Sequence, residues 1–500
     1  MKFHNGVKMV CILGAGSILM SARGQAQNAQ PTIDPEIVKT ILSAESTPPQ
    51  TPVNTQTATP AEPLAPLQKL EDVLRYSYVH NKSLQSVRAG MKAVQERLPQ
   101  ALSGWKPTVS ATAGINAADI DGAGPLSDGG ISKDIEARFS QPLYRGGRTV
   151  AATGSAMNVI LAQRSLLRDQ EQNVLLATAT SYMDVSRDTA LLSLAENNQD
   201  VIGRQTKATQ QRFDVGDLTR TDVSQAQARF AGAEANRIGA QGNLQKSRAV
   251  FEQVTGQPVG LTGDPQLKFP IPETLDQAVD QAEKYNPRIV AARFLHRAAQ
   301  KDIDLVFGEM LPQLGLSGSI GRSYDPQPGL LDETTTKSIG VNATVPIYTA
   351  GLTQSRVREA KYTANQRYLE ILGAASNVRE EVVRNWENLR AAQAEITSRI
   401  AQVEATRLAQ EGVHQEAEVG ARTILDALDA EQEYLDAQAA LITARRNEIV
   451  ATFALASTLG MLSPETLGFP ELKEDFDAQF DADTWKFLGT DVDIREPGAQ

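Results

Sequence analysis

Two kinds of hydrophobic spacing alternate along this chain. Residues 107–116 and 135–139 place apolar side chains at every second position, and the same period recurs at residues 314–320 and 339–345. A period of two predicts β-strands with one apolar face, here two strand pairs of about ten residues per strand. Residues 378–403 instead place apolar side chains at steps of three or four, which predicts a helix with one apolar seam.

Long helices are predicted directly after each strand pair. Proline is absent from residues 143–257 and from residues 347–463. The stretch from Thr149 to Asp214 contains 66 residues without a helix stop, which corresponds to a helix of roughly 100 Å. Gly216 and Gly420 interrupt the two proline-free stretches, and a second helix of about 40 residues is expected to return from each turn.

The same order of elements occurs twice. Asn81 and Pro107 recur 205 residues later, and a further set recurs 204 residues later: Pro142, Tyr144, Gly147, Gly216, Asp222 and Gly256. We therefore expect two homologous repeats, residues 67–258 and 270–462, with strand pairs near 107–144 and 312–348. Short helices are expected to precede the strands, such as Leu275–Tyr285 and Ile289–Glu309, separated by Asn286 and Pro287.

The two ends of the chain differ in composition from the repeats. Lys2 and Lys8 accompany an apolar stretch that is too short to span a bilayer, so residues 1–26 are expected to be a secretory signal peptide. Residues 27–66 are rich in proline and threonine, which is typical of a linker. Residues 463–500 are expected to form an acidic tail, since residues 471–500 hold nine acids and three bases.

Charge and residue types argue against several functions. The net charge is −11, and removal of the signal peptide would leave −14, whereas a nucleic-acid backbone selects basic surfaces. Cys11 is the only cysteine and lies in the predicted signal peptide. The histidines at positions 4, 80, 296 and 414 share no spacing typical of metal ligands. We therefore expect no nucleic-acid partner, no cofactor, no metal site and no catalytic residues.

Strands of this length in an exported chain suggest a transmembrane barrel, because about 9–11 tilted residues cross a bilayer. Four strands cannot close, and open edges in lipid leave backbone groups unpaired, so copies of the chain must share one barrel. Eight strands would be filled by side chains, whereas twelve can leave a water-filled lumen. If the strands do face lipid, the expected fold is an α+β membrane protein: a trimeric 12-stranded transmembrane β-barrel, continued by a long periplasmic α-helical coiled-coil barrel. Alternation over ten residues is also typical of soluble hairpins, which is the alternative reading of the strands.

Five motifs occur in this order along the two repeats: "FSQPLYRGGRT", "RFDVGDLTRTDVSQAQA", "LPQLGLSGS", "VNATVPIYTAGLT" and "EVGARTILDALDAEQEYLDAQA". With these motifs, residues 67–462 resemble the TolC-like outer-membrane factors of Gram-negative bacteria. The resemblance implies a homotrimeric channel in the bacterial outer membrane, with most of its mass in the periplasm. It also implies a periplasmic adaptor (membrane fusion protein) and an inner-membrane ABC or RND-type transporter as partners.

The implied function is a passive exit duct, gated at its periplasmic end, of a tripartite efflux pump or a type I secretion system. The first alternative is a soluble periplasmic coiled-coil adaptor without a pore. The second is a secreted enzyme, for which the sequence offers no convergent polar constellation.

Asp426 and Asp429 are the candidate gate residues. They lie three positions apart in a predicted helix and therefore share one face, so that three copies would place six carboxylates at one constriction. Such a ring selects cations, and crowding of like charges should raise some of the carboxylate pKa values. The resemblance implies that these aspartates form the periplasmic entrance, whereas the plain alternative is a solvated helix face.

The resemblance also implies a latch and a docking surface. Arg422 would hold the gate shut through contacts with Thr221 and Asp222 on the other helix pair. The sequence departs from the family pattern at Ala417, where a latch tyrosine is expected. The turns that match the adaptor-docking tips comprise Val215, Gly216, Asp217, Val419, Gly420 and Ala421.

Overall fold

The computed structural model describes residues 69–118, 130–258, 260, 269–327 and 331–472. The predicted signal peptide (1–26) and linker (27–66) lie outside the described residues, as does the acidic tail from residue 473 onward. The boundaries proposed for the two repeats therefore stay a prediction, although the elements inside them can be compared directly.

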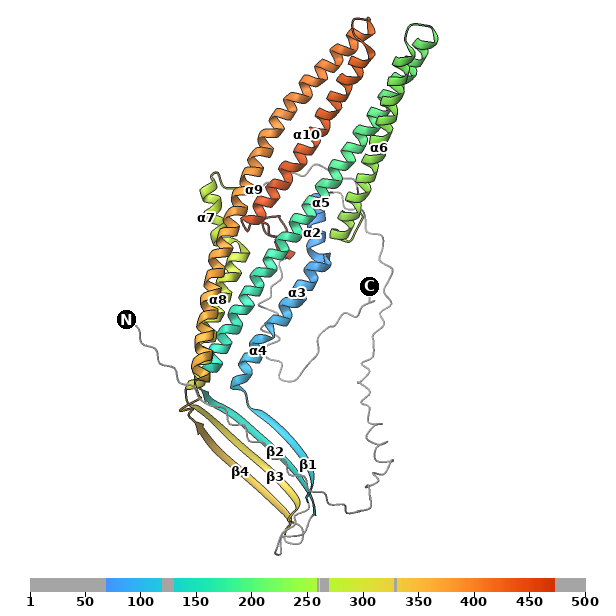
Figure 1. Ribbon diagram of the computed structural model, residues 1–500. Helices are drawn as coiled ribbons and strands as arrows, with labels where there is room; N and C mark the ends of the chain where they lie inside the picture. The colour runs from blue at the N-terminus through green and yellow to red at the C-terminus, as the bar shows by residue number, and fades with distance from the viewer. Residues whose placement is uncertain (1–68, 119–129, 259, 261–268, 328–330, 473–500) are drawn as a thin grey trace, which may run out of the picture. The chain divides into compact units, whose positions relative to one another are not determined.

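The described strands form one antiparallel sheet in the order β1-β2-β3-β4 (Figure 1). The strands are β1 (Thr108–Ala118), β2 (Gly130–Arg145), β3 (Gln313–Gln327) and β4 (Leu331–Thr344). This confirms the two predicted strand pairs, although each strand is longer than ten residues. Pairing of β2 with β3 joins the strand pairs of the two repeats, and it leaves β1 and β4 as the edges of the sheet.

One face of the sheet is largely apolar, although it also carries Lys133, Arg322, Glu333 and Lys337, and the other face is polar. Register places large apolar residues of all four strands on one face, and each of them is more than half exposed: Val109, Ile115, Ile131, Ile135, Ile320, Ile339 and Val341. The opposite face carries Ser110, Thr112, Glu136, Arg138, Ser317, Ser319, Ser338 and Asn342. The period of two read from the sequence is thus confirmed as a two-faced sheet.

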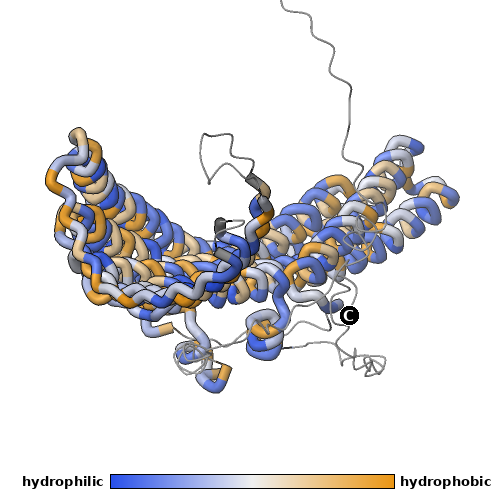
Figure 2. The backbone as a smooth tube through the Cα atoms, turned by 90° about the horizontal axis from the view of Figure 1, so that it is seen from below, coloured by the Kyte–Doolittle hydropathy of each residue, from blue (hydrophilic) through white to orange (hydrophobic). Residues whose placement is uncertain are grey.

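Two long helical hairpins follow the strand pairs (Figure 1). The first contains α5 (Arg148–Asp214) and α6 (Arg220–Thr255), and the second contains α9 (Leu352–Glu418) and α10 (Ile424–Thr458). Helices α5 and α9 have 67 residues each, so the predicted Thr149–Asp214 helix is confirmed within one residue. Hydrophobic and hydrophilic residues are interspersed along these helices (Figure 2). Among the described residues, no helix combines the length and apolar character needed to cross a membrane.

Shorter helices precede each strand pair, and one 3-10 turn follows α10. They are α2 (Leu70–His80), α3 (Lys82–Gln95), α4 (Arg97–Leu102), α7 (Leu275–Tyr285) and α8 (Pro287–Phe307), with 3-10 turns η1 (Ser103–Trp105), η2 (Gly308–Met310) and η3 (Pro470–Leu472). The prediction for α7 is confirmed. Helix α8 begins two residues before the expected Ile289, because proline needs no donor at the first helical position and Asn286 caps the helix.

The repeated asparagines explain why both repeats fold alike. Asn81 caps α3 and donates from Nδ2 to the Val254 carbonyl of α6 at 2.8 Å. Asn286 caps α8 and donates in the same way to the Thr458 carbonyl of α10 at 2.9 Å. Each asparagine therefore fastens a short helix to the end of the helix that returns to the sheet side of its hairpin.

Two apolar cores stabilise the described elements. The first packs α2, α3 and α4 against α5, with Leu74, Leu84 and Leu175 fully buried, and it also contains Phe251 of α6 and Phe453 of α10. The second packs α7 and α8 against α9 and α10, with Ile289 and Val382 fully buried. Complete burial of one such side chain stabilises the fold by about 1.5–3 kcal/mol.

The predicted seam on α9 is confirmed only in its sheet-proximal part. Val378, Val382, Trp386, Leu389 and Ala392 are buried. Further along the seam, Ile400 is 50% exposed. The buried part packs against the second core that α7 and α8 help to form, whereas the far part extends beyond that core.

Candidate functional site

Glycine turns end both long helices at the far end of each hairpin. Gly216 has φ 86°, and the Asp217 N–H donates to the Arg212 carbonyl at 2.9 Å. Gly420 has φ 77°, and the Ala421 N–H donates to the Glu416 carbonyl at 2.8 Å. These bonds close Schellman-type turns, which require the left-handed conformation that glycine adopts without a Cβ clash. The expectation that the two glycines end helices is confirmed.

Capping boxes begin both returning helices. Thr423 precedes α10; its hydroxyl accepts from the Asp426 N–H at 3.2 Å, and the Asp426 carboxylate accepts from the Thr423 N–H at 3.1 Å. Thr219 and Asp222 make the same pair of bonds before α6. Asp222 and Asp426 therefore occupy the third helical position of matching caps. The sequence pattern Thr-x-x-Asp, which occurs in both repeats, is the pattern that indicates a capping box.

These bonds favour the ionised form of Asp426. The hydroxyl and backbone N–H of Thr423 lower the pKa of the Asp426 carboxyl, and the charge of Arg422 lowers it further. Hydrogen bonds from the Thr219 backbone and hydroxyl likewise lower the pKa of Asp222. Within one chain, the shift of Asp426 is thus opposite to the rise expected from crowding of carboxylates, because capping stabilises the charged form.

Asp429 makes an ion pair that the sequence did not reveal. Arg229 Nη2 of α6 donates to Asp429 Oδ1 of α10 at 2.5 Å, and the two side chains are 43% and 54% exposed. This bond joins the first hairpin to the second. No sequence signal pointed to Arg229, because 200 residues separate it from its partner and periodicity does not fix the register between two hairpins.

The expected latch contacts are absent among the described residues. Arg422 Nε donates to Glu416 Oε2 at 2.9 Å, on the other side of the same glycine turn. No hydrogen bond or ion pair there joins Arg422 to Thr221 or Asp222. Glu416 pairs with Arg422 locally, and the Asp222 carboxylate accepts its own capping bonds, so the latch through Thr221 and Asp222 stays a prediction.

Three further features lie between the hairpins. Leu428 of α10 is buried against Ile202 of α5 and Ala233 of α6. A cavity of about 290 Å³ lies beside this contact and is lined in part by Arg229 and Leu428. Nearer the sheet, Arg446 of α10 donates to Asp184 of α5 at 2.8 Å, through side chains that are 20% and 26% exposed.

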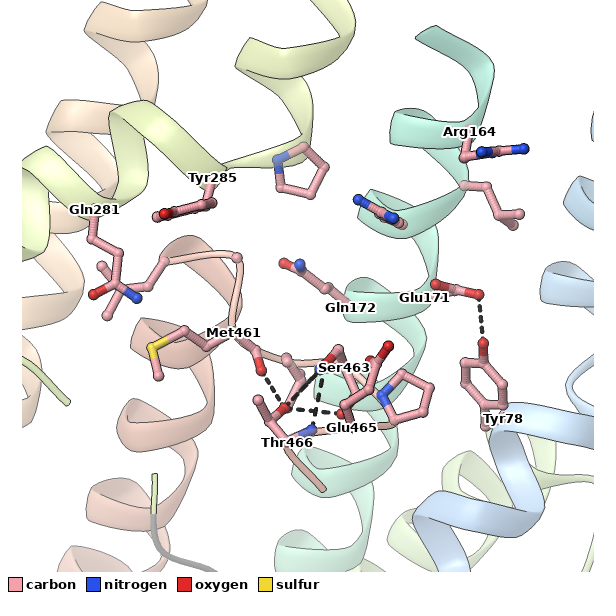
Figure 3. Close-up of a pocket in the computed structure, with 17 residues that line it drawn as sticks. Tyr78, Arg164, Glu171, Gln172, Gln281, Tyr285, Met461, Ser463, Glu465 and Thr466 are labelled. Atoms are coloured by element: carbon pink, nitrogen blue, oxygen red, sulfur yellow. Dashed lines mark hydrogen bonds between the residues drawn. The ribbon is translucent and has the colours of Figure 1, made fainter. Parts of the chain in front are cut away.

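A further cavity lies away from the predicted gate. It has a volume of about 820 Å³ and is lined by α2, α5, α7, the start of α8 and the loop after α10 (Figure 3). Tyr78 donates to Glu171 there at 2.7 Å, and burial followed by the charge of Glu171 raises the pKa of Tyr78. None of the candidate gate, latch or tip residues lines this cavity.

The exposed positions at the hairpin ends are matched between repeats. Val215 and Val419, which precede the turn glycines, are each 81% exposed. Among the described residues, no group of three or more His, Cys, Asp or Glu side chains has the geometry of a metal site. The ends of the hairpins thus present two exposed valines, and the ion pair between Arg229 and Asp429 joins the hairpins nearby.

The sequence model for the outer membrane efflux protein family matches residues 74–257 and 278–461. The chain belongs to the outer membrane efflux protein family. It is therefore an exit duct of the outer membrane for efflux or secretion, with much of its mass in the periplasm, and the adaptor alternative is set aside.

Individual relatives agree with this assignment. The outer membrane efflux protein BepC of Brucella suis is 31% identical over 402 residues, which cover 80% of this chain and 87% of BepC. The outer membrane protein TolC of Vibrio cholerae is 28% identical over 406 residues, which cover 80% of this chain and 92% of TolC. The crystal structure of the CmeC outer membrane channel of Campylobacter jejuni shares the fold, with a TM-score of 0.70, 16% identity and coverage of 83% and 89% of the two chains.

Proposed function

We propose that three copies of this chain form one 12-stranded transmembrane barrel. The observation that carries the proposal is the two-faced sheet with two unpaired edges, β1 and β4. Edges that face lipid must pair with another strand, so the edge of one copy meets the edge of the next. The apolar face then contacts outer-membrane lipid, and the polar face lines a lumen that twelve strands leave open to water.

The six hairpins of three copies continue this lumen into the periplasm as a helical tube. The exposed far part of the α9 seam, which includes Ile400, supports this arrangement, because a neighbouring copy would cover it. Arg422 of one copy would contact Thr221 and Asp222 of a neighbouring copy.

The periplasmic entrance is gated by Asp426 and Asp429. Both lie in the first two turns of α10, directly after the Gly420 turn; Asp429 is exposed and Asp426 is half-buried. Three copies would place six carboxylates there, although each Asp429 is paired with Arg229. The entrance would favour cations through this ring.

The tips at Val215–Asp217 and Val419–Ala421 are proposed to dock a periplasmic adaptor. Two valines that are 81% exposed at the ends of hairpins are apolar anchors for a partner. The adaptor would connect the duct to an inner-membrane ABC or RND-type transporter. Both a tripartite efflux pump and a type I secretion system fit this arrangement.

Native mass spectrometry and planar-bilayer conductance test the proposal. Detergent-purified protein is expected to have the mass of three copies and to give small, cation-selective conductance. Replacing Asp426 and Asp429 together by asparagine removes both charges and keeps an oxygen that can accept the capping bonds, so cation selectivity should fall. Asp436→Asn is the matched control, because Asp436 lies further along the same helix and bonds to Gln432.

Each outcome is decisive for one part of the proposal. Absence of conductance from wild type would overturn the channel. A mass other than three copies would overturn the trimer. Unchanged selectivity in the double variant, with wild-type conductance intact, would move the gate away from these aspartates.

A further inference from the structure

The ion pair between Arg229 and Asp429 has a distinctive position. It joins α6 to α10 at 2.5 Å, and both side chains remain about half exposed. Water and salt can therefore compete for both groups, which makes the bond reversible. A reversible link between two hairpins is suited to a contact that must open and close.

Apolar packing around the pair is sparse. The buried cluster that joins the hairpins there consists of Ile202, Ala233 and Leu428, with Phe230 and Ile424 packed against it. The cavity of about 290 Å³ lies in the same region, and Arg229 lines it. Few apolar contacts connect the hairpins at this level, and the ion pair is the charged contact that joins them there.

The second link between the hairpins differs in character. Asp184 accepts from Arg446 at 2.8 Å and pairs with Arg187 at 3.1 Å, and all three side chains are about three-quarters buried. A shared carboxylate with two arginines in a less exposed site is harder to separate than a half-exposed pair. The hairpins are therefore expected to part first at Arg229 and to stay joined at Asp184.

We infer that Arg229 determines both the closure and the charge of the periplasmic entrance. In the closed entrance Arg229 neutralises Asp429 and ties α10 to α6. Separation of the hairpins breaks the pair, moves Arg229 away and exposes the Asp429 carboxylate. The open entrance thus carries one more unpaired carboxylate per chain than the closed one. This inference rests on the gate proposed above.

Single-channel conductance and reversal potential across a KCl gradient test the inference. Arg229→Gln should raise the open probability, because loss of an exposed pair shifts an equilibrium by about 1.4-fold to fivefold per chain. If the three pairs of a trimer act together, the shift is roughly 3-fold to 150-fold. Arg229→Gln should also increase cation selectivity, whereas Asp429→Asn should increase opening and decrease cation selectivity.

Both variants break the same contact between the hairpins, but they should change cation selectivity in opposite directions. This difference separates the effect of charge from the effect of a weaker contact. A charge swap, Arg229→Asp with Asp429→Arg, should restore low conductance, since the reversed pair can form the same contact. Misfolding would not be rescued by the second substitution. Arg237→Gln is the matched control, because Arg237 lies two turns further along α6 and bonds to Gln241 of its own helix.

Failure of the inference and failure of the gate give different results. If Asp429→Asn changes selectivity but Arg229→Gln behaves like Arg237→Gln, the pairing is refuted and the gate stands. If neither Asp429→Asn nor the double variant of Asp426 and Asp429 changes selectivity, the gate is refuted and the inference falls with it. Failure of the charge swap to restore low conductance, with its oligomeric mass unchanged, would also refute the pairing.

Discussion

Val341 offers a direct test of which sheet face meets lipid. It lies on the apolar face of β4, is 61% exposed, and has Leu316 of β3 as its cross-strand partner. Ile339 and Ala343 flank it on the same face. An arginine at the lipid-facing midplane of a barrel costs about 2–4 kcal/mol per chain. The change Val341→Arg is therefore expected to lower the free energy of unfolding by about 2–4 kcal/mol per chain, or roughly 6–12 kcal/mol per trimer.

Gly340→Arg is the depth-matched control. Gly340 is the preceding residue of the same strand, faces the opposite side and has Ser317 as its partner. A Cβ added at Gly340 meets no atom within 4 Å. An arginine there would point into the proposed water-filled lumen, so the free energy of unfolding should change by less than about 1 kcal/mol.

Urea unfolding of the protein in phospholipid vesicles, followed by tryptophan fluorescence, measures both variants. The predicted loss is a large fraction of a typical domain stability of about 5–15 kcal/mol, so Val341→Arg should also reduce the yield of assembled protein in the outer membrane. Equal losses for Val341→Arg and Gly340→Arg, or a loss only for Gly340→Arg, would refute the assignment of the faces.

Three further predictions concern helix ends. Thr423→Ala removes the hydroxyl that caps α10 and should destabilise the first turn by about 0.5–2 kcal/mol, seen as faster amide exchange there. The lowered pKa values of Asp222 and Asp426 mean that their caps contribute fully above the unfolded pKa of about 3.9 and weaken as pH falls through the folded values. Amide protection factors at the two helix starts, which are the intrinsic exchange rate divided by the observed one, should therefore fall as pH drops below about 4 and stay constant between pH 6 and pH 8. Asn286→Ala should lower the free energy of unfolding by about 1–3 kcal/mol, because it leaves the Thr458 carbonyl without its 2.9 Å bond, and a thermal melt measures this loss.

The fold was largely readable from the sequence because its signals are local or repeated. Alternation over ten residues predicts a strand, and a long proline-free run predicts a helix, without knowledge of any partner. Because the same residues recur 204–205 positions later, a weak pattern in one repeat was supported by the same pattern in the other. The end of the α9 seam at Ile400 shows the limit, since periodicity identifies an apolar face but does not say what covers it.

The site was readable only where its contacts are local. The Gly216 and Gly420 turns and the Thr-x-x-Asp caps each involve residues within a few positions of one another, so the sequence contains their full description. The charge pattern of Asp426 and Asp429 was visible too, but it pointed to two equivalent carboxylates. The structure makes them unequal, because Asp426 caps its own helix and Asp429 reaches across to Arg229.

This inequality bears on how the entrance is held without a tyrosine at position 417. Ala417 has no polar side-chain group, and Arg422 bonds to Glu416 within its own hairpin. A latch must join elements that move apart, so a bond inside one hairpin does not resist their separation. Arg229 and Asp429 do join two hairpins; Arg229 lies two turns after the capping residue Asp222, and Asp429 lies about one turn after the capping residue Asp426. A closed entrance therefore does not require a tyrosine on α9 at position 417. The Arg229–Asp429 pair between the facing surfaces of α6 and α10 can join the two hairpins instead.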